Sequence, residues 1–190
     1  MSTQRLLSFV QDITRLLETH PAESVILTEG KQFVARLVEK DDWLPDEFAR
    51  PHPDHYQQYL LYADPFDRLS IVSFVWGPGQ KTPVHDHLTW GIVGGLRGEE
   101  REVTYRRQNG GGYEVTGDGV LLPGQTTAVS PTIGDVHAVS NNLADRASIS
   151  IHVYGKNIGR VNRHVFDPAS GAEKAFVSGY VNAVVPNLWS

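Results

Sequence analysis

The stretch PVHDHLTWGIVGGLRGEE, residues 83–100, places two histidines one residue apart, just before a glycine-rich run. In a β-strand, residues i and i+2 point to the same side, so His85 and His87 project together while Asp86 points the other way. Two imidazoles on one side of a strand are candidate metal ligands. Such a pair can equally be the polar end of a surface strand, so the surrounding sequence has to separate the two interpretations.

From residue 56 onward, the chain consists of short segments rich in β-branched and aromatic residues, separated by glycine, proline and asparagine. This pattern predicts a mainly β sandwich or barrel rather than a β-α-β fold. The segment NGGG, 109–112, is typical of a hairpin tip. The predicted strands are 56–63, 70–77, 90–98, 100–107, 113–117, 119–124, 126–131, 137–141, 147–155 and 160–167.

The beginning of the chain has a different pattern. Apolar residues recur at helical spacings over 3–19 and again over 28–40, which predicts two amphipathic helices. Three prolines within residues 43–56 interrupt this pattern. We therefore expect an N-terminal helical segment, 1–55, packed on a β-barrel, 56–190, within a single structural domain.

The composition narrows the classes of function. The chain has 190 residues, a formal net charge of -5 and no cysteine, which excludes disulfides, thiolate zinc sites and a cysteine nucleophile. No basic stripe is present, so a nucleic-acid partner is not expected. The N-terminal stretch lacks the apolar core of a secretion signal, and no apolar run approaches the length of a membrane span. We expect a cytoplasmic protein with no membrane partner.

A third histidine stands in a second pattern. His137 follows a turn and opens a predicted strand, about fifty residues after His87. Pro131, Gly134 and Asn141 accompany it in the order P-x-x-G-x-x-H-x-x-x-N. Three imidazoles from two strands can bind one face of a metal ion and leave the other face open.

The first pattern resembles the first sequence motif of the cupin superfamily, in which an H-x-H pair stands between glycines and is followed by a glutamate. Gly79, the two histidines and Gly98 match this motif, but Gly91 occupies the glutamate position. The resemblance implies a double-stranded β-helix barrel, also called a jelly roll. The spacing is much more specific than the histidine pair alone, and it disfavours the surface interpretation.

The second pattern resembles the second cupin motif, with one extra residue between the proline and the glycine. This resemblance implies that His85, His87 and His137 are the metal ligands. His152 is a rival third ligand on sequence grounds. The glycine and asparagine around His137 favour that residue instead.

Glycine in the glutamate position leaves three neutral imidazoles as ligands. A divalent metal then keeps its full charge and has about three open positions, which favours anionic ligands. A substrate thiolate and a second donor can fill two positions and leave one for dioxygen. Such a site resembles that of the thiol dioxygenases, non-haem enzymes that oxidise a thiol to a sulfinate with both atoms of O2. The resemblance implies Fe(II) as cofactor, and a small thiol and O2 as partners.

Independent support comes from the segment ASISIHVYG, 147–155, where Ser150, His152 and Tyr154 alternate along a predicted strand and face one way. Taken alone, they form a half-polar strand with satisfied side chains. The thiol dioxygenases carry a similar Ser-His-Tyr triad after the third ligand. The resemblance implies that Tyr154 directs its hydroxyl toward the open metal positions, that His152 bonds Tyr154 and that Ser150 bonds His152.

The substrate prediction depends on two departures from the mammalian-type cysteine dioxygenases. Those enzymes crosslink a cysteine to the triad tyrosine, but Gly91 occupies that position here; their carboxylate-binding arginine on an early strand is also missing. The bacterial branch resembling 3-mercaptopropionate dioxygenase departs in the same ways, and the stretch 73–87 matches its pattern SFVWGPGQ-x-TPVHDH. In that branch an arginine after the triad tyrosine binds the substrate carboxylate. Arg163 takes this place, with Arg160 as a nearby competitor.

The leading hypothesis is an Fe(II) enzyme that oxidises 3-mercaptopropionate to 3-sulfinopropionate. The same chemistry on L-cysteine, cysteamine or mercaptosuccinate is the first alternative. A non-catalytic cupin that stores or senses a small ligand is the second, because a fold does not determine a function. The sequence leaves the oligomeric state open.

Overall fold

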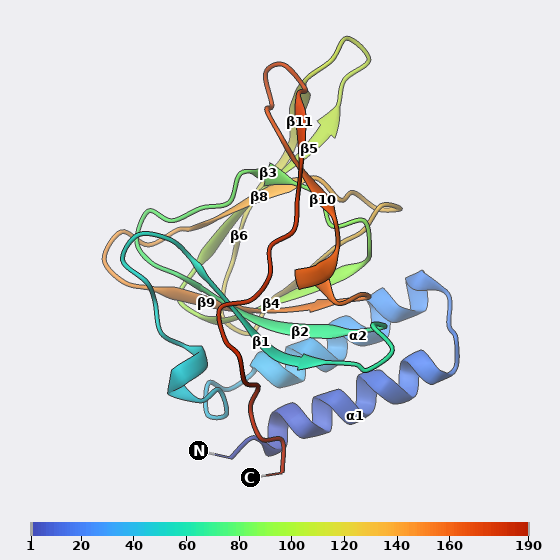
Figure 1. Ribbon diagram of the computed structural model, residues 1–190, viewed down its shortest axis with the longest axis vertical. Coiled ribbons are helices and arrows are strands. Elements are labelled where there is room, and N and C mark those ends of the chain that lie inside the picture. The colour runs from blue at the N-terminus through green and yellow to red at the C-terminus, as the bar shows by residue number, and fades with distance from the viewer. Residues whose placement is uncertain (1, 190) are drawn as a thin grey trace.

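Two antiparallel sheets form the body of the molecule (Figure 1). The computed structural model describes residues 2–189. One sheet has the strand order β1 (Gln57–Ala63), β2 (Ser70–Trp76), β9 (Ser148–Tyr154), β4 (Gly91–Arg97) and β7 (Thr126–Val129). The other has the order β11 (Glu173–Phe176), β10 (Arg163–Phe166), β3 (Val84–His85), β8 (His137–Asn141), β5 (Glu100–Arg107) and β6 (Tyr113–Leu121).

Two helices, α1 (Gln4–Glu18) and α2 (Glu23–Val38), cover the outer side of the β1–β2–β9–β4–β7 sheet (Figure 1). Short 3-10 turns lie at Asp46–Phe48 and Ile158–Arg160. One apolar core joins both helices to this sheet, and it includes Leu6, Val34 and Ile151. The first and last described segments meet, because the Thr3 hydroxyl donates to the Asn187 carbonyl.

The central strand β9 is buried on both faces, although every second side chain, from Ser148 to Tyr154, is polar. Ile149, Ile151 and Val153 belong to the core beneath the helices. The alternate residues, which include the predicted triad, face the interior between the two sheets, where Tyr154 packs in a smaller apolar cluster. The period of two therefore places a polar row inside the barrel without exposing an apolar row on the surface.

Glycine allows α2 to lie close to β4. A Cβ atom on Gly94 would come within 2.6 Å of the Val34 side chain and 2.9 Å of the Val38 side chain. Any side chain at this position would therefore force the helix or the two valine side chains to shift.

The structure confirms a mainly β, double-stranded β-helix fold with N-terminal helices, but several predicted boundaries were wrong. Helix α2 begins at Glu23 rather than at residue 28, because an acidic first turn after Pro21 starts the helix before its apolar face becomes evident. The predicted strands 113–117 and 119–124 form one strand, β6. Gly117 lies beside an irregularity in the β5–β6 pairing and contacts Thr104, so it marks a local bulge rather than a turn.

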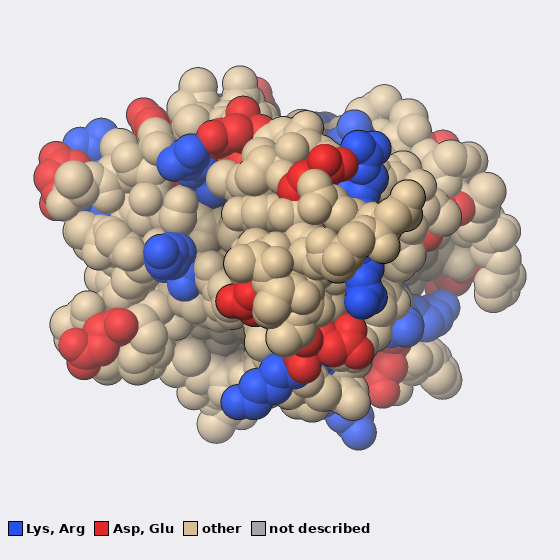
Figure 2. Space-filling view, turned by 90° about the horizontal axis from the view of Figure 1, so that it is seen from above, with Lys and Arg blue, Asp and Glu red and all other residues tan. Residues whose placement is uncertain are grey.

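The surface shows no concentration of one charge on the face drawn in Figure 2, where acidic and basic side chains are interspersed. Within residues 2–189, no helix has both the length and the apolar character needed to cross a membrane.

Candidate metal centre and its cavity

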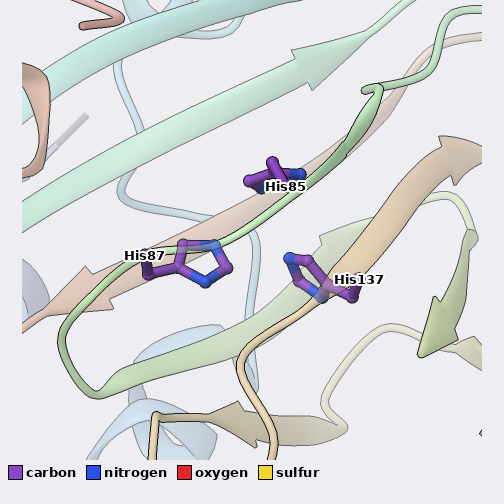
Figure 3. A group of neighbouring side chains, drawn as sticks. All are labelled: His85, His87 and His137. Carbon is purple, nitrogen blue, oxygen red and sulfur yellow. The ribbon is translucent and has the colours of Figure 1, made fainter. Parts of the chain in front are cut away.

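Three buried histidines converge between the sheets (Figure 3). His85 ends β3 and pairs directly with His137, the first residue of β8, while His87 lies two residues beyond His85. Their ligand atoms all lie within 4.8 Å of one another. The structure thus brings together the three predicted ligands.

Each of these imidazoles has its Nδ1 nitrogen hydrogen-bonded away from the shared centre. The His85 Nδ1 bonds the Pro83 carbonyl at 3.0 Å, and the His87 Nδ1 bonds the Asp135 carboxylate at 2.9 Å. The His137 Nδ1 bonds the Glu102 carboxylate at 2.6 Å. Since these acceptors take the Nδ1 protons, each Nε2 keeps its lone pair for a metal ion.

Asp135 also holds the chain in position after His87. Its Oδ2 atom accepts hydrogen bonds from the backbone N–H groups of His87, at 3.1 Å, and Leu88, at 2.9 Å. Leu88 has a φ of 56°, a left-handed conformation that is unfavourable for a bulky residue. These bonds stabilise the bend and fix the direction of the His87 ring.

The electrostatics of the site favour neutral imidazoles. Burial, followed by repulsion from His137, lowers the pKa values of His85 and His87 well below the ordinary histidine value. Neutral nitrogens backed by carbonyl and carboxylate acceptors fit a divalent transition metal, and imidazole suits iron, zinc, copper and nickel alike. The residues present therefore fit a three-histidine metal site, and they do not by themselves select the metal.

The predicted triad forms a continuous hydrogen-bonded line. Ser150 Oγ lies 2.8 Å from His152 Nε2, and His152 Nδ1 lies 2.8 Å from the Tyr154 hydroxyl. The Trp76 indole also donates to Ser150 Oγ at 3.3 Å. Both ring nitrogens of His152 are therefore occupied, which argues against this residue as the third ligand.

Tyr154 lies next to the metal-ligand group. Its ring stacks on His87 with 5.4 Å between ring centroids. Burial raises the pKa of the Tyr154 hydroxyl, so it stays protonated at neutral pH. A Cβ atom on Gly91 would lie 3.0 Å from the tyrosine ring, so Gly91 stands beside Tyr154 without a group that could be crosslinked to it.

A cavity of about 220 Å³ opens beside His85, His137 and Tyr154. At about 30 Å³ for each water in the liquid, this volume matches several waters or one small organic molecule. An aromatic wall formed by Tyr56, Phe74 and Trp76 borders the cavity.

The structure separates the two candidate arginines. Arg163 begins β10, lines the cavity and is 4% exposed. Its guanidinium donates to Ser178 Oγ at 2.8 Å and lies over the Phe176 ring, but its Nε has no hydrogen-bond partner. Arg160 has a side chain that is 74% exposed and pairs with Asp67 at the surface.

Several residues of the site were missed by sequence reasoning. Of the two carboxylate acceptors, Asp135 had a weak signal, since it precedes His137 by two residues, and Glu102 had none. Lys174, Phe176 and Ser178 line the cavity from the C-terminal region, which the motifs do not reach. They gave no signal, because β11 is mostly exposed and its sequence has no alternating pattern.

The fold and the site together define a cupin with a buried three-histidine candidate metal centre. The chain belongs to the cysteine dioxygenase type I family, which it matches over residues 6–167.

Solved structures with a similar fold are distant in sequence. The protein TT1209 from Thermus thermophilus is 21% identical, with 58% of this chain and 92% of that chain covered and a TM-score of 0.44. A double-stranded β-helix protein from Klebsiella pneumoniae is also 21% identical, with 68% and 91% covered and a TM-score of 0.44. A cupin superfamily protein from Desulfitobacterium hafniense is 15% identical, with 62% and 94% covered and a TM-score of 0.45.

Proposed function

We propose that this protein is an Fe(II)-dependent thiol dioxygenase that oxidises 3-mercaptopropionate to 3-sulfinopropionate. One thiol and one O2 give one sulfinic acid, so both oxygen atoms enter the product and no other reductant is needed. Family membership and the buried three-histidine group support the class of reaction. We also propose that the protein acts in the cytoplasm, where small thiols are kept reduced.

The buried guanidinium of Arg163 is the observation that carries the choice of substrate. It has no carboxylate within ion-pair distance among the described residues, and one of its donors is free. A desolvated cation of this kind is stabilised by an anionic ligand. A carboxylate that enters the cavity can fill that role.

The other charges of the cavity wall favour a thiol without an ammonium group. Among the described residues that line the cavity, the only side chains with a fixed charge are Arg163 and Lys174, both positive. An ammonium group such as that of L-cysteine would meet no opposite charge there. This arrangement favours 3-mercaptopropionate over L-cysteine and cysteamine.

The residues of the chain divide the remaining tasks. Arg163 binds and orients the carboxylate, the aromatic wall excludes water, and the Tyr154 hydroxyl offers a hydrogen bond beside the metal ligands. His85, His87 and His137 would hold the iron, which supplies the redox chemistry for binding and activating dioxygen.

The test is oxygen consumption by anaerobically purified, iron-loaded protein that is offered 3-mercaptopropionate, L-cysteine, cysteamine and mercaptosuccinate separately, with sulfinate quantified. We expect one sulfinate per O2, and the highest kcat/KM for 3-mercaptopropionate. In Arg163→Met, loss of the charged hydrogen bonds should raise KM for this thiol by about 10- to 100-fold.

Arg160→Met is the matched control, because Arg160 points to solvent, and its KM should stay at the wild-type value. Fully iron-loaded protein that oxidises none of the four thiols would contradict the dioxygenase assignment. A preference for L-cysteine that survives Arg163→Met would contradict only the choice of substrate.

A further inference from the structure

Glu100, the first residue of β5, carries a buried carboxyl group that the proposed function does not use. Its side chain is 3% exposed, and both carboxyl oxygens lack a partner in standard hydrogen-bond geometry. A carboxyl group is rarely buried without a partner, because removing its charge from water is costly. Glu102, two residues along the same strand, bonds the ligand His137, so the polar face of β5 points into the barrel.

The groups around the Glu100 carboxyl connect it to the triad. The Ser150 hydroxyl from β9 and the Trp76 indole from β2 lie near it without a hydrogen bond of standard geometry, and they favour its charged form. Glu102 is the charged neighbour, on the same strand, and it opposes ionisation. Burial is the largest effect, and it raises the pKa of Glu100 to about 8.

The neighbouring strands bring no charge that would compensate. In the sheet register, Glu100 stands opposite Leu121 on β6 and Asn141 on β8. The Asn141 amide is already engaged, since it donates to the carbonyls of Trp76 and Arg146. Of the groups near Glu100, the Ser150 hydroxyl is the one that belongs to the hydrogen-bonded line leading to Tyr154.

Ser150, His152 and Tyr154 are already joined by hydrogen bonds, and a small rotation of the Glu100 carboxyl toward Ser150 would extend this line to Glu100. The extended line has two self-consistent arrangements. When Glu100 is neutral, it donates to Ser150, Ser150 donates to His152 Nε2, and His152 Nδ1–H donates to the Tyr154 oxygen. The Tyr154 O–H is then free to donate into the cavity. When Glu100 is charged, Ser150 donates to it, His152 Nε2–H donates to Ser150, and Tyr154 donates its proton to His152 Nδ1.

We propose that Glu100 is the terminal positioning residue of a relay formed with Ser150, His152 and Tyr154, and that its protonation sets the direction of the hydrogen bonds. A neutral Glu100 keeps the tyrosine hydroxyl available as a donor beside the metal ligands, and a charged Glu100 withdraws it. The effect on turnover rests on the proposed function. The effect on the His152 tautomer does not.

The first test is a pH titration of metal-free, ¹⁵N-histidine-labelled protein by NMR, with the His152 signals assigned through their loss in His152→Gln. We expect the ring proton of His152 to lie on Nδ1 at pH 6.5 and on Nε2 at pH 9.5. In Glu100→Gln, the neutral amide can donate to Ser150 but cannot ionise, so the proton should stay on Nδ1 throughout. The neighbouring Glu99→Gln should behave like wild type, because Glu99 instead accepts from the Asn142 side chain.

The second test is the pH dependence of kcat with iron-loaded protein. We expect the wild-type kcat to fall above about pH 8, and Glu100→Gln to lose this alkaline decline while KM for the thiol stays within about twofold. A wild-type His152 tautomer that does not change between pH 6.5 and 9.5 would overturn the proposal, and this result needs no variant. If the tautomer switches as expected but no thiol is oxidised, the proposed function fails while the role of Glu100 stands.

Discussion

Glu102 shows how one side chain outside the ligand set can control a metal site. Its carboxylate lies 2.6 Å from His137 Nδ1 and also accepts from the Thr127 hydroxyl. A negatively charged acceptor fixes the histidine tautomer and makes Nε2 a stronger donor to a metal. Glu102→Gln keeps the shape and removes the charge.

We therefore expect Glu102→Gln to weaken Fe(II) binding by about 10- to 100-fold, measured anaerobically by competition with a chelator of known affinity. Glu114→Gln is the control, because Glu114 pairs with Arg106 on the surface and should leave the affinity unchanged. Equal affinities for Glu102→Gln and wild type would show that Glu102 does not tune the site.

Spacing alone found the residues that are local in sequence, the resemblance to known motifs added His137 and Arg163, and partners that depend only on strand pairing were missed. Ser150 and His152 stand two apart on β9, and His87 stands two residues beyond His85 at the end of β3, so the period of two predicts that each pair faces one way. Glu102 reaches His137 because the register places β5 beside β8. No spacing within a single strand indicates that partner, and the same is true of Glu100 beside Ser150.

At the scale of elements, the contact between α2 and β4 depends on a missing side chain. A methyl group on Gly94 would lie 2.6 Å from Val34, so the helix would have to move or the valine would have to change its rotamer. We expect Gly94→Ala to lower the free energy of unfolding by about 1–3 kcal/mol, measured by urea denaturation.

Gly119→Ala is the matched control, because a Cβ there would meet no atom within 4 Å, and its effect should stay within about 0.5 kcal/mol. Adding Val34→Ala to Gly94→Ala removes the closer of the two contacts, the other being with Val38, so the double variant should be more stable than the sum of the single effects predicts. Strict additivity would mean that the helix does not press on the sheet at this point.

The helices and strands were predictable to the extent that their burial pattern is periodic. Helix α1 has a single apolar face, and its predicted range 3–19 is close to the observed Gln4–Glu18. The strand β6 was divided in the prediction because GDG, 117–119, is typical of a turn in the absence of a known partner strand. The hairpin of β10 and β11 covers the cavity. Its second strand, β11, was not predicted, because three of its four residues are exposed and its sequence has no alternating pattern.

At the scale of the whole molecule, the buried carboxyl of Glu100 makes stability depend on pH. Its pKa is about 8 in the folded protein and near the ordinary value of 4.5 in the unfolded chain. Between these values the folded state holds a proton that the unfolded state has released. The free energy of unfolding therefore falls as the pH rises from about 5 to about 8, and the loss is complete above the folded pKa.

At acidic pH, the buried histidines have the opposite effect on the stability of the protein. The pKa values of His85, His87 and His152 lie well below 6.5 in the folded protein, so the unfolded state binds more protons below that pH. Stability should rise with pH up to about 6.5 from this contribution. Because the three histidines are present in both proteins, a comparison of wild type with Glu100→Gln isolates the carboxyl.

We expect Glu100→Gln to be more stable than wild type by a margin that grows from pH 5 to pH 9 and reaches a few kcal/mol, since each pKa unit corresponds to about 1.4 kcal/mol. Urea denaturation of both metal-free proteins at pH 5, 7 and 9 measures this margin, and Glu99→Gln should follow wild type at every pH. If the difference in stability between the two proteins is constant over this range, Glu100 is already charged at pH 5 in the folded wild type. A partner other than Ser150 and Trp76 would then have to stabilise the buried charge.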